Sequence, residues 1–385
     1  MQRILGLTAA LLLSACDSQA VKLYTDLPKD QNVLFWTQDQ RDTAFRQMEK
    51  LVDVNQIPAG GTVLALPQGA PIELSLDIDA YMKSQRNAGL IIIQDGKVRF
   101  EKYALDYDAK GRWTSFSVAK PFTSTLVGAA LKDGFIKSLE DKVTVYIPDL
   151  KGSAYDDVSV RQLLTMTSGV AWNEDYTDPK SDVALFNTHK AEPGVDVTVS
   201  YMRKLKREAP AGSKWVYKTG ETNLIGVLVS SATKKTLSAY LSEKVWKPYG
   251  MEQDAIWMLG NTGHEISGCC LSATLRDYAR LGLFISGGGV VAGKSIFPND
   301  WLSQATTKQA DIETPGKGYG FQWWTYDDKS FAAQGIFGQG IFIDPSRKLV
   351  IASNGNWPTA TDADGVGAER ERFYKAVQVA IDAGQ

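Results

Sequence analysis

The sequence has few of the residues that build metal centres or long-range disulfides. Its 385 residues contain three cysteines and two histidines, and the histidines are His189 and His264. Structural zinc sites use four Cys or His ligands at short spacings, so we expect no metal. Cys269 and Cys270 are adjacent and cannot link distant segments, so they form either a ring disulfide between neighbours or two small buried side chains. The fold must therefore be held by its hydrophobic core.

The chain also lacks an excess of positive charge. Lysine and arginine total 42, aspartate and glutamate total 44, and the net charge is -2. Because nucleic-acid-binding proteins usually carry a basic excess, we expect no nucleic-acid partner. A hydrophobic content of 44% and a charged content of 22% are ordinary for a soluble globular protein, and they exclude a disordered chain or one with many membrane spans. This length fits one large domain or two intertwined ones.

An apolar stretch at the N-terminus is too short to cross a bilayer. It runs from Ile4 to Leu13, follows Arg3 and ends in small residues, which is typical of a signal peptide. Residues 13–16, Leu-Ser-Ala-Cys, resemble a bacterial lipobox, and the resemblance implies cleavage after residue 15 and lipidation of Cys16. The alternative is a plain secretory signal with an incidental cysteine.

We therefore expect residues 1–15 to be a lipoprotein signal peptide and residues 16–34 to be a polar tether. The protein would be exported and held by a lipid anchor at Cys16, on the periplasmic side of a bacterial envelope. Asp17 follows that cysteine. In enteric bacteria an aspartate there tends to retain lipoproteins on the inner membrane, but without the host the choice between inner and outer membrane stays open.

The order of the predicted elements indicates an α+β protein. Strands near both ends and helices between them predict a sheet domain made of residues 35–125 and 300–385, with a mostly helical lobe, residues 126–299, inserted in it. The first predicted helix begins at Thr37, which forms a capping box with Gln40, and its helical spacing continues to Leu51. Further helices are predicted over 122–131, 276–284 and 368–381. Strands are predicted over 90–93 and 98–100, joined by an Asp-Gly turn, and over 320–326, 340–343 and 349–353.

Ser117 and Lys120 form the first candidate for chemistry. Pro121 is tolerated only near the first turn of a helix, so Ser117 should lie at a helix start. There the helix dipole favours an alkoxide, and Lys120 lies three residues on, on the same face. The dipole and burial both disfavour the ammonium, so a neutral Lys120 can take the serine proton. A second Ser-x-x-Lys, at Ser231 and Lys234, sits late in a predicted helix beside solvated lysines and is not favoured.

Tyr217 and the segment 334–339 are two further candidates. Tyr217 follows a turn and precedes a helix expected near Glu221, so its phenol could face a cleft and relay a proton. In the segment 334–339, Gly335 allows the backbone to approach a substrate closely and to offer the Ile336 N–H to an oxyanion. The alternative is an ordinary strand with glycines at its edge.

Two other sequence patterns carry less weight. Residues 288–295 match the phosphate-binding P-loop pattern, but a P-loop follows a strand and opens a helix. Here a helix is predicted before the pattern, and Pro298 would cut a helix after it, so we expect no nucleotide and no other cofactor. Because no Gly-x-Ser-x-Gly occurs, a hydrolase with an exposed elbow serine is not expected either.

These residues together resemble one family, the serine hydrolases related to class C β-lactamases and penicillin-binding proteins. Besides the Ser-x-x-Lys, the resemblance rests on the segments 163–169 (Leu-Leu-Thr-Met-Thr-Ser-Gly), 246–251 (Trp-Lys-Pro-Tyr-Gly-Met) and 271–277 (Leu-Ser-Ala-Thr-Leu-Arg-Asp). It runs from about Phe35 to the C-terminal helix. The resemblance implies a β-lactamase/DD-peptidase-like fold, in which an antiparallel sheet is flanked by helices and the active site lies in the cleft beside an inserted helical lobe.

Within this family, residues 172–176 and 335–339 look like the branch of aminohexanoate-dimer hydrolases and related esterases. The resemblance implies that Ser117 is the nucleophile, Lys120 its base and Tyr217 a proton relay. It also implies an oxyanion hole formed by the backbone N–H groups of Ser117 and Ile336. The residues expected to line the substrate cleft are Trp172, Tyr176 on a closing loop, Thr219, Gly335, Phe337, and Trp323 or Trp324.

The sequence departs from class C β-lactamases at two places. Those enzymes usually have asparagine where this sequence has Thr219, and Lys-Thr-Gly where this sequence has Ala333-Gln334-Gly335. The lysine of that triplet helps to bind the β-lactam carboxylate. Its absence argues against efficient β-lactam hydrolysis and leaves the acylating residues untouched.

The sequence thus predicts a serine hydrolase that cleaves small esters or amides through an acyl-enzyme. Two alternatives stay open: a β-lactamase or peptidoglycan DD-peptidase, and a non-catalytic envelope binding protein on the same fold. The expected partners are a small ester or amide substrate and the membrane that holds the lipid anchor. Neither the acyl group nor the oligomeric state follows from fold and family.

Overall fold

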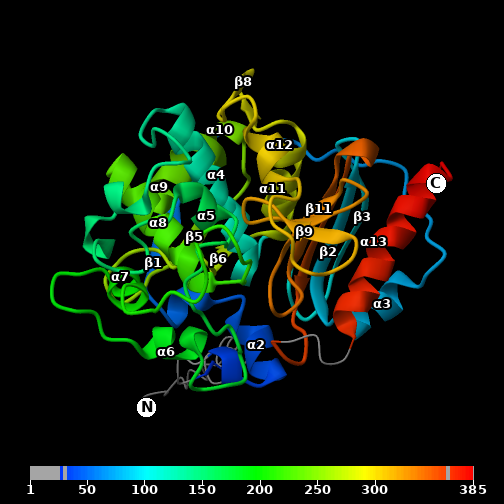
Figure 1. Ribbon diagram of the computed structural model, residues 1–385. Helices are drawn as coiled ribbons and strands as arrows, with labels where there is room; N and C mark the ends of the chain where they lie inside the picture. Colours follow the sequence, from blue (N-terminus) through cyan, green and yellow to red (C-terminus); the bar gives the residue numbers. More distant parts are fainter. Residues whose placement is uncertain (1–26, 29–32, 361–364, 385) are drawn as a thin grey trace, which may run out of the picture.

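The computed structural model describes residues 27–28, 33–360 and 365–384 (Figure 1). The predicted signal peptide and Cys16 lie outside these residues, so the lipid anchor stays a prediction. Of the predicted tether, Leu27 packs against the main hydrophobic core, so the end of that segment is not simply polar. In the part of the chain that the structure describes, no helix is both long enough and apolar enough to cross a membrane.

The centre of the fold is an antiparallel sheet of seven strands built from both ends of the chain, which confirms the predicted α+β class. The strand order is β3-β2-β13-β12-β11-β10-β9. The strands are β2 (Asn87–Gln94), β3 (Lys97–Tyr103), β9 (Lys317–Tyr319), β10 (Trp324–Tyr326), β11 (Phe331–Gln334), β12 (Gly340–Asp344) and β13 (Leu349–Gly355).

Strand β2 shows why its sequence is an unbroken apolar run. Leu90 and Ile92 point to one face of the sheet and Ile91 and Ile93 to the other, and each pair joins a different hydrophobic cluster. Both faces are covered, so no position on the strand is left for a polar side chain. The predicted turn to β3 is confirmed: Asp95 and Gly96 both have positive φ, 49° and 73°, as a tight two-residue hairpin turn requires.

Helices cover both faces of this sheet (Figure 1). Helices α3 (Ile78–Ser84) and α13 (Val366–Asp382) lie on one face, where Tyr81 stacks on Phe373 with ring centroids 4.0 Å apart. Helix α11 (Leu275–Ser286) packs on the other face, against β2, β12 and β13. It falls in the range assigned to the helical lobe, but its apolar stripe is buried on the sheet, so structurally it belongs with the sheet.

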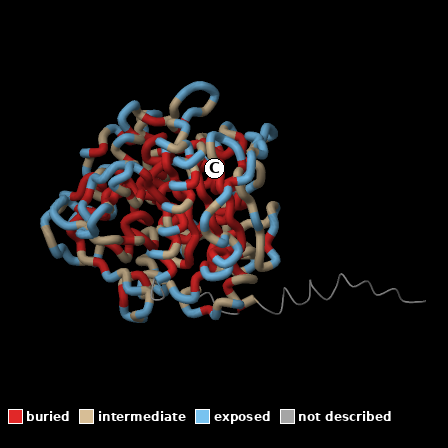
Figure 2. Tube along the Cα trace, turned by 90° about the vertical axis from the view of Figure 1, so that its right-hand side faces the viewer, coloured by how far each residue is buried: buried red, intermediate tan, exposed pale blue. Residues whose placement is uncertain are grey.

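The remaining helices form the second part of the molecule, beside the sheet (Figure 1). Helix α8 lies at its centre and packs against α4, α5 and α7. The helices here are α4 (Ala119–Lys132), α5 (Val160–Leu164), α6 (Asp182–Thr188), α7 (Val197–Met202), α8 (Thr219–Thr233), α9 (Leu237–Leu241), the π-helical turn η6 (Ser242–Trp246) and α10 (Lys247–Tyr249). The tube coloured by burial shows buried residues running through the interior of the molecule (Figure 2).

A second, smaller sheet was not predicted from the sequence. Its order is β1-β5-β6-β4, with β1 (Val54–Ile57), β5 (Ala255–Met258), β6 (Leu271–Ala273) and β4 (Trp113–Thr114). Two of these strands have only two or three residues, too few to show an alternating pattern. The sheet matters because β4 ends just before Ser117, and its neighbour β6 follows Cys269 and Cys270 directly.

Several predicted elements are shorter or more broken than expected. The capping box at Thr37 is present, but helix α2 (Gln38–Ala44) ends before the predicted Leu51 and is followed by a separate turn, η2 (Met48–Lys50). The strand predicted over 320–326 is interrupted by a turn in which Gln322 has φ 68°. The P-loop-like segment forms the hairpin of β7 (Val290–Val291) and β8 (Lys294–Ser295). The other short helices are η1 (Val33–Phe35), η3 (Phe116–Val118), η4 (Val143–Val145), η5 (Pro148–Leu150), α12 (Trp301–Ala305) and η7 (Pro345–Arg347).

Candidate active site

Ser117 lies on the single turn η3, which runs directly into helix α4. Pro121 is the third residue of that helix, where its missing N–H removes no intrahelical hydrogen bond. The residue before the serine, Phe116, has φ 43°, a conformation that costs a bulky side chain roughly 1–3 kcal/mol. Its ring is held between Phe45 and Phe337, both with ring centroids 5.0 Å away. Core packing thus forces the turn that presents Ser117.

Lys120 lies on the first turn of α4 and is 1% exposed. Its Nζ donates hydrogen bonds to the Gly268 carbonyl at 2.7 Å and to Thr219 Oγ1 at 3.0 Å. Burial lowers the Lys120 pKa to about 8. A neutral amine has two N–H groups and one lone pair, and these two bonds occupy both N–H groups. The lone pair of Nζ is then free to accept a proton. Lys120 lies three residues after Ser117 in the sequence.

Tyr217 faces the same place from the segment before α8. Its ring stacks on Trp324 with centroids 5.5 Å apart, and Lys120 Nζ lies 5.1 Å from its centroid. Burial raises the pKa of the Tyr217 phenol strongly, and the hydrogen bond with Ser117 lowers it by less. The phenol therefore stays protonated at ordinary pH. This separates the two groups chemically, because Lys120 is the one that can be a free base and Tyr217 the one that can donate a proton.

Gly335 and Ile336 lie at the end of strand β11, which contacts η3. A Cβ atom at Gly335 would stand 2.8 Å from the Ser115 carbonyl, so only glycine lets the strand approach the nucleophile turn this closely. The following turn is fixed by bonds from the N–H groups of Gly335, Phe337 and Gly338. Within the described residues the Ile336 N–H donates to no backbone acceptor, as an oxyanion donor requires.

The aromatic residues predicted for the cleft divide into two groups. Phe337 is fully buried, packs on Phe45 and Phe116, and carries the Arg41 guanidinium 4.3 Å above its ring, so the structure places it in the core and not in an open cleft. Trp323 is likewise buried, against Phe331. An aromatic side chain suits a buried core or an apolar cleft equally well, and only the tertiary packing shows that Phe337 and Trp323 lie in the core.

Trp324, by contrast, belongs to an aromatic wall behind Tyr217. Its other members are Trp215 and Tyr319, with ring centroids 5.9 and 5.2 Å from Trp324, and sequence reasoning singled out neither. The buried Trp215 Nε1 and Tyr319 hydroxyl have no hydrogen-bond partner within the described residues. The wall is therefore a packed aromatic cluster behind Tyr217, and its two unpartnered polar atoms are enclosed by protein.

Glu174 is the charged residue of the site that sequence reasoning did not select. It lies between the predicted cleft residues Trp172 and Tyr176, and both donate to its carboxylate, Tyr176 at 2.7 Å and Trp172 through its indole nitrogen. Thr219 donates to it twice, from its backbone N–H at 3.0 Å and from its hydroxyl. Three of the predicted cleft residues are thus brought together by one carboxylate.

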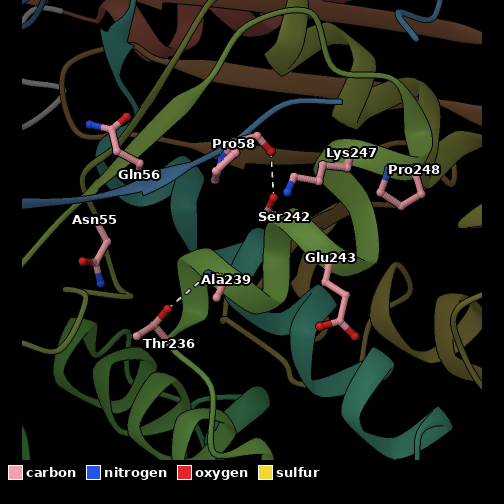
Figure 3. A pocket seen from close by; sticks show the side chains of 9 residues that line it. All are labelled: Asn55, Gln56, Pro58, Thr236, Ala239, Ser242, Glu243, Lys247 and Pro248. Atoms are coloured by element: carbon pink, nitrogen blue, oxygen red, sulfur yellow. Dashed lines mark hydrogen bonds between the residues drawn. The ribbon is translucent and has the colours of Figure 1, made fainter. Parts of the chain in front are cut away.

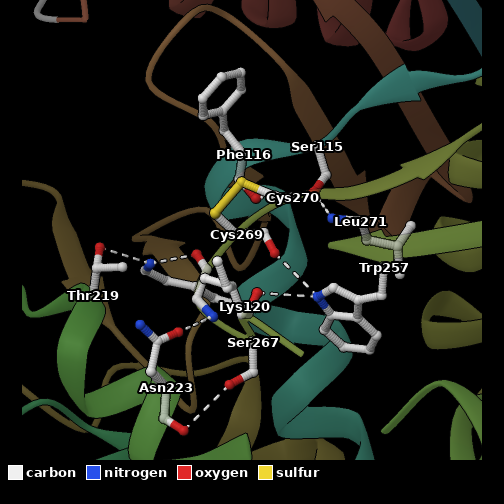
Figure 4. Close-up of a disulfide and its surroundings, with 12 residues drawn as sticks. Ser115, Phe116, Lys120, Thr219, Asn223, Trp257, Ser267, Cys269, Cys270 and Leu271 are labelled. Carbon is white, nitrogen blue, oxygen red and sulfur yellow. Dashed lines mark hydrogen bonds between the residues drawn. A yellow bond between two sulfur atoms is a disulfide. The ribbon is translucent and has the colours of Figure 1, made fainter. Parts of the chain in front are cut away.

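Cys269 and Cys270 form a disulfide, which decides between the two alternatives left by the sequence (Figure 4). A bond between adjacent residues closes almost no loop, so it restricts the unfolded chain little. Its place is more informative, because the preceding residue is Gly268, whose carbonyl accepts from Lys120. The Gly268 N–H donates to Asn223 Oδ1 at 2.7 Å, and the Trp257 indole bonds the Cys269 carbonyl at 3.0 Å. The acceptor of Lys120 is therefore held from several sides.

The positions that match the Lys-Thr-Gly of β-lactamases hold no lysine in this chain. They lie at the end of β11, an interior strand between β10 and β12. Ala333 is 1% exposed, and the Gln334 side chain is occupied by the Tyr326 hydroxyl and by Arg370, both at 2.8 Å. Among the described residues, no group of three or more Asp, Glu, His or Cys side chains could hold a metal ion.

A separate hollow lies between β1 and the helices α9 and η6 (Figure 3). Asn55, Thr236 and Glu243 help to line it, and it contains none of the residues described above.

Comparison with known proteins agrees with this geometry. The sequence pattern of the Beta-lactamase family matches residues 75–373. The chain is 27% identical to a 6-aminohexanoate-dimer hydrolase of Paenarthrobacter ureafaciens over 299 residues, which cover 73% of this chain and 76% of that protein.

Two solved structures are similar in fold. The first is a Bacillus anthracis protein named as an unproven 6-aminohexanoate-dimer hydrolase. The two structures superpose with a TM-score of 0.80 at 21% sequence identity, and the match covers 93% of this chain and 99% of the Bacillus chain. The second is a family VIII carboxylesterase, with a TM-score of 0.61 at 16% identity, covering 81% of this chain and 99% of its own. The predicted resemblance is confirmed: the chain belongs to the Beta-lactamase family and is a serine hydrolase.

Proposed function

We propose that this hydrolase cleaves small esters or linear amides through an acyl-enzyme on Ser117. The observation that carries the proposal is the buried Lys120 amine, whose two N–H groups are taken by Gly268 and Thr219. This arrangement leaves its lone pair for a proton, and a pKa of about 8 makes the free base accessible near neutral pH.

The residues suit both halves of the reaction. Ser117 Oγ attacks the substrate carbonyl carbon while its proton passes to Lys120, and the backbone N–H groups of Ser117 and Ile336 hold the oxyanion. When the intermediate collapses, the bond to the leaving oxygen or nitrogen breaks. Lys120 returns its proton to that leaving atom by way of the Tyr217 hydroxyl. Water then attacks the acyl ester by the same route in reverse, releasing the acid and restoring Ser117.

The surroundings favour a neutral or linear substrate over a β-lactam. Strand β11 offers no lysine for a lactam carboxylate, because Ala333 and Gln334 stand there, and the Arg370 guanidinium nearby is bonded to Gln334. Trp215 and Trp324, which are only partly buried beside Tyr217, provide apolar area for an acyl chain or a leaving group. The names of two similar proteins, a 6-aminohexanoate-dimer hydrolase and a family VIII carboxylesterase, support the same substrate class.

The proposal is tested by giving the purified protein three substrates: p-nitrophenyl butyrate, the linear dimer of 6-aminohexanoate and a chromogenic cephalosporin. We expect turnover of the ester or the amide at a kcat/KM at least about 100-fold above that for the cephalosporin. Intact mass after rapid quenching should show one acyl group per chain. Faster turnover of the cephalosporin would favour the β-lactamase alternative, and no turnover together with no adduct would favour the binding protein.

We also propose that the enzyme is exported and anchored to a bacterial membrane through Cys16. Support comes from the charged start, the short apolar stretch and the Leu-Ser-Ala-Cys ending of the N-terminal segment. The protein produced in bacteria should sediment with membranes, and the Cys16→Ser variant should appear in the soluble fraction or remain unprocessed. Equal membrane association of both forms would contradict the anchor.

A further inference from the structure

Glu174 lies on a segment without regular structure, yet its carboxylate is held by several hydrogen bonds. Its two carboxylate oxygens accept four hydrogen bonds: Oε1 from the Tyr176 and Thr219 hydroxyls, and Oε2 from the Trp172 indole and the Thr219 backbone N–H. The last of these is at the first residue of α8, where a helix N-terminus favours a negative charge. The carboxylate therefore ties the segment 172–176 to the start of α8.

The packing around this carboxylate is equally close. A Cβ atom at Gly220 would lie 2.8 Å from the Trp172 ring, so the glycine after Thr219 lets the indole lie directly against α8. Trp172 is 7% exposed and its ring meets Tyr201 edge to face at 6.2 Å. The position of Glu174 is thus fixed by its neighbours, and its charge stands at one defined place.

From that place the carboxylate reaches the catalytic lysine through one hydroxyl. Lys120 Nζ donates to Thr219 Oγ1 at 3.0 Å, and the same hydroxyl donates its own hydrogen to Glu174 Oε1. A hydroxyl has one hydrogen, so while it donates to the carboxylate it can only accept from Lys120. Glu174 therefore dictates that a Lys120 N–H points at Thr219 and that the lone pair points elsewhere. Figure 4 shows Lys120 between Thr219 and the disulfide segment.

Glu174 is also the charged group that acts on Lys120. Its charge raises the Lys120 pKa and so opposes the larger effect of burial, which lowers it. Lys218 and Glu221, at the start of α8, form a buried pair of opposite charge 3.8 Å apart. The titratable side chains on the elements packed around Lys120 are Glu174, Tyr176, Tyr217, Lys218, Glu221 and Glu265. Both tyrosines stay protonated, because burial raises the pKa of each phenol.

We propose that Glu174 is a positioning residue for the catalytic lysine: through the Thr219 hydroxyl it orients Lys120 Nζ and fixes where the lone pair points. Because its negative charge also acts on that amine, neutralising it should change the pH dependence of the reaction. The inference rests on the proposed chemistry of Ser117 and Lys120. Thr219 and Glu174 together then determine the direction of the Lys120 lone pair. The arrangement also gives a role to an acidic residue that takes no covalent part in the reaction.

The test compares the pH dependence of kcat/KM for a neutral ester in the full chain and in three variants. Glu174→Gln removes the charge at nearly constant size. Without the anion the ammonium form of Lys120 is less stable, so the midpoint of the rise in kcat/KM should move to lower pH by about one unit. The plateau should fall about tenfold or more, because an amide nitrogen would face two of the four donors.

Two matched variants separate charge from geometry. Glu174→Asp keeps the charge on a shorter side chain, so the plateau should fall while the midpoint stays close to that of the wild type. Asp175→Asn neutralises the next residue, an exposed carboxylate that accepts hydrogen bonds from Thr177 and from the Asp178 backbone, and should change neither quantity. An unshifted midpoint in Glu174→Gln, or an equal shift in Asp175→Asn, would overturn the inference.

A second pair of variants decides the matter if Glu174→Gln does not fold. Thr219→Val removes the connecting hydroxyl and should lower the plateau about tenfold, whereas Thr219→Ser should keep most of it. Equal activity of these two variants would contradict the connection. Failure of the underlying chemistry is recognised separately, because a wild-type protein that neither turns over the ester nor reacts with a fluorophosphonate would refute the proposed function and not the role of Glu174.

Discussion

Replacing Ser117 by alanine is expected to lower kcat/KM for ester hydrolysis by about 10⁴-fold or more, because no other atom can form the acyl bond. The same change should cost less than about 1 kcal/mol of stability, a shift of about 2 °C in melting temperature, since one hydroxyl is lost from a turn held by core packing. Phe116, which fixes that turn, is unaffected. The measurements are steady-state kinetics, thermal unfolding, and the intact mass after treatment with a fluorophosphonate.

The chain offers its own control for this experiment. Ser231 and Lys234 repeat the Ser-x-x-Lys spacing, but the Ser231 hydroxyl donates to the Tyr146 carbonyl at 2.6 Å and lies late in α8. Ser231→Ala should therefore keep wild-type kinetics and still take up one fluorophosphonate. An adduct that persists in Ser117→Ala, or that disappears in Ser231→Ala, would mean that the nucleophile has been assigned to the wrong serine.

The two serines also show what local sequence can and cannot decide. The choice of Ser117 over Ser231 followed from Pro121, a short-range signal that placed one serine at the beginning of a helix. The observed junction of η3 with α4 agrees with it. The predicted hairpin at Asp95 and Gly96 succeeded for the same reason, since its backbone requirement is written in two adjacent residues.

Features that depend on contacts between distant segments could not be predicted from the sequence. Glu174 was passed over although it lies inside the segment 172–176 that carries the family resemblance, because its contact with Thr219 spans 45 residues of sequence. Phe337 was expected in the cleft because it is an aromatic residue of the segment that resembles the family, but its ring packs on Phe45 and Phe116 in the core. The two-residue strand β4 pairs with β6, across more than 150 residues, and carries no pattern of its own.

The structure brings together around Lys120 groups that lie far apart in the sequence. The three groups that control Lys120 come from different parts of the chain: Gly268 beside the disulfide, Thr219 at the start of α8, and Glu174 on the preceding segment. Each of them contacts the lysine or its hydrogen-bond partner, and none of them reacts. The Ser-x-x-Lys pattern marks two residues three positions apart, whereas the groups around Lys120 come from segments far apart in the sequence.

Replacing Lys120 is the second change with a very large expected effect. In the wild type, kcat/KM should rise about tenfold per pH unit at low pH and level off above a midpoint near 8, because only the neutral amine accepts the serine proton and burial holds its pKa at about 8. At pH 7 roughly one molecule in ten then carries the free base.

Lys120→Arg is the informative substitution. Arginine retains a cation and hydrogen-bond donors for Gly268 and Thr219, but its guanidinium does not lose a proton in this range, so it cannot act as the base. We expect kcat/KM to fall about 10³-fold or more and the rise centred near pH 8 to disappear. Lys234→Arg, at the exposed lysine of the second Ser-x-x-Lys, should change neither the rate nor the profile. If Lys120→Arg kept both the wild-type midpoint and a substantial rate, another group would have to take the serine proton. Tyr217 is poorly suited to that role, because burial keeps its phenol protonated over the whole range in which the enzyme would be assayed.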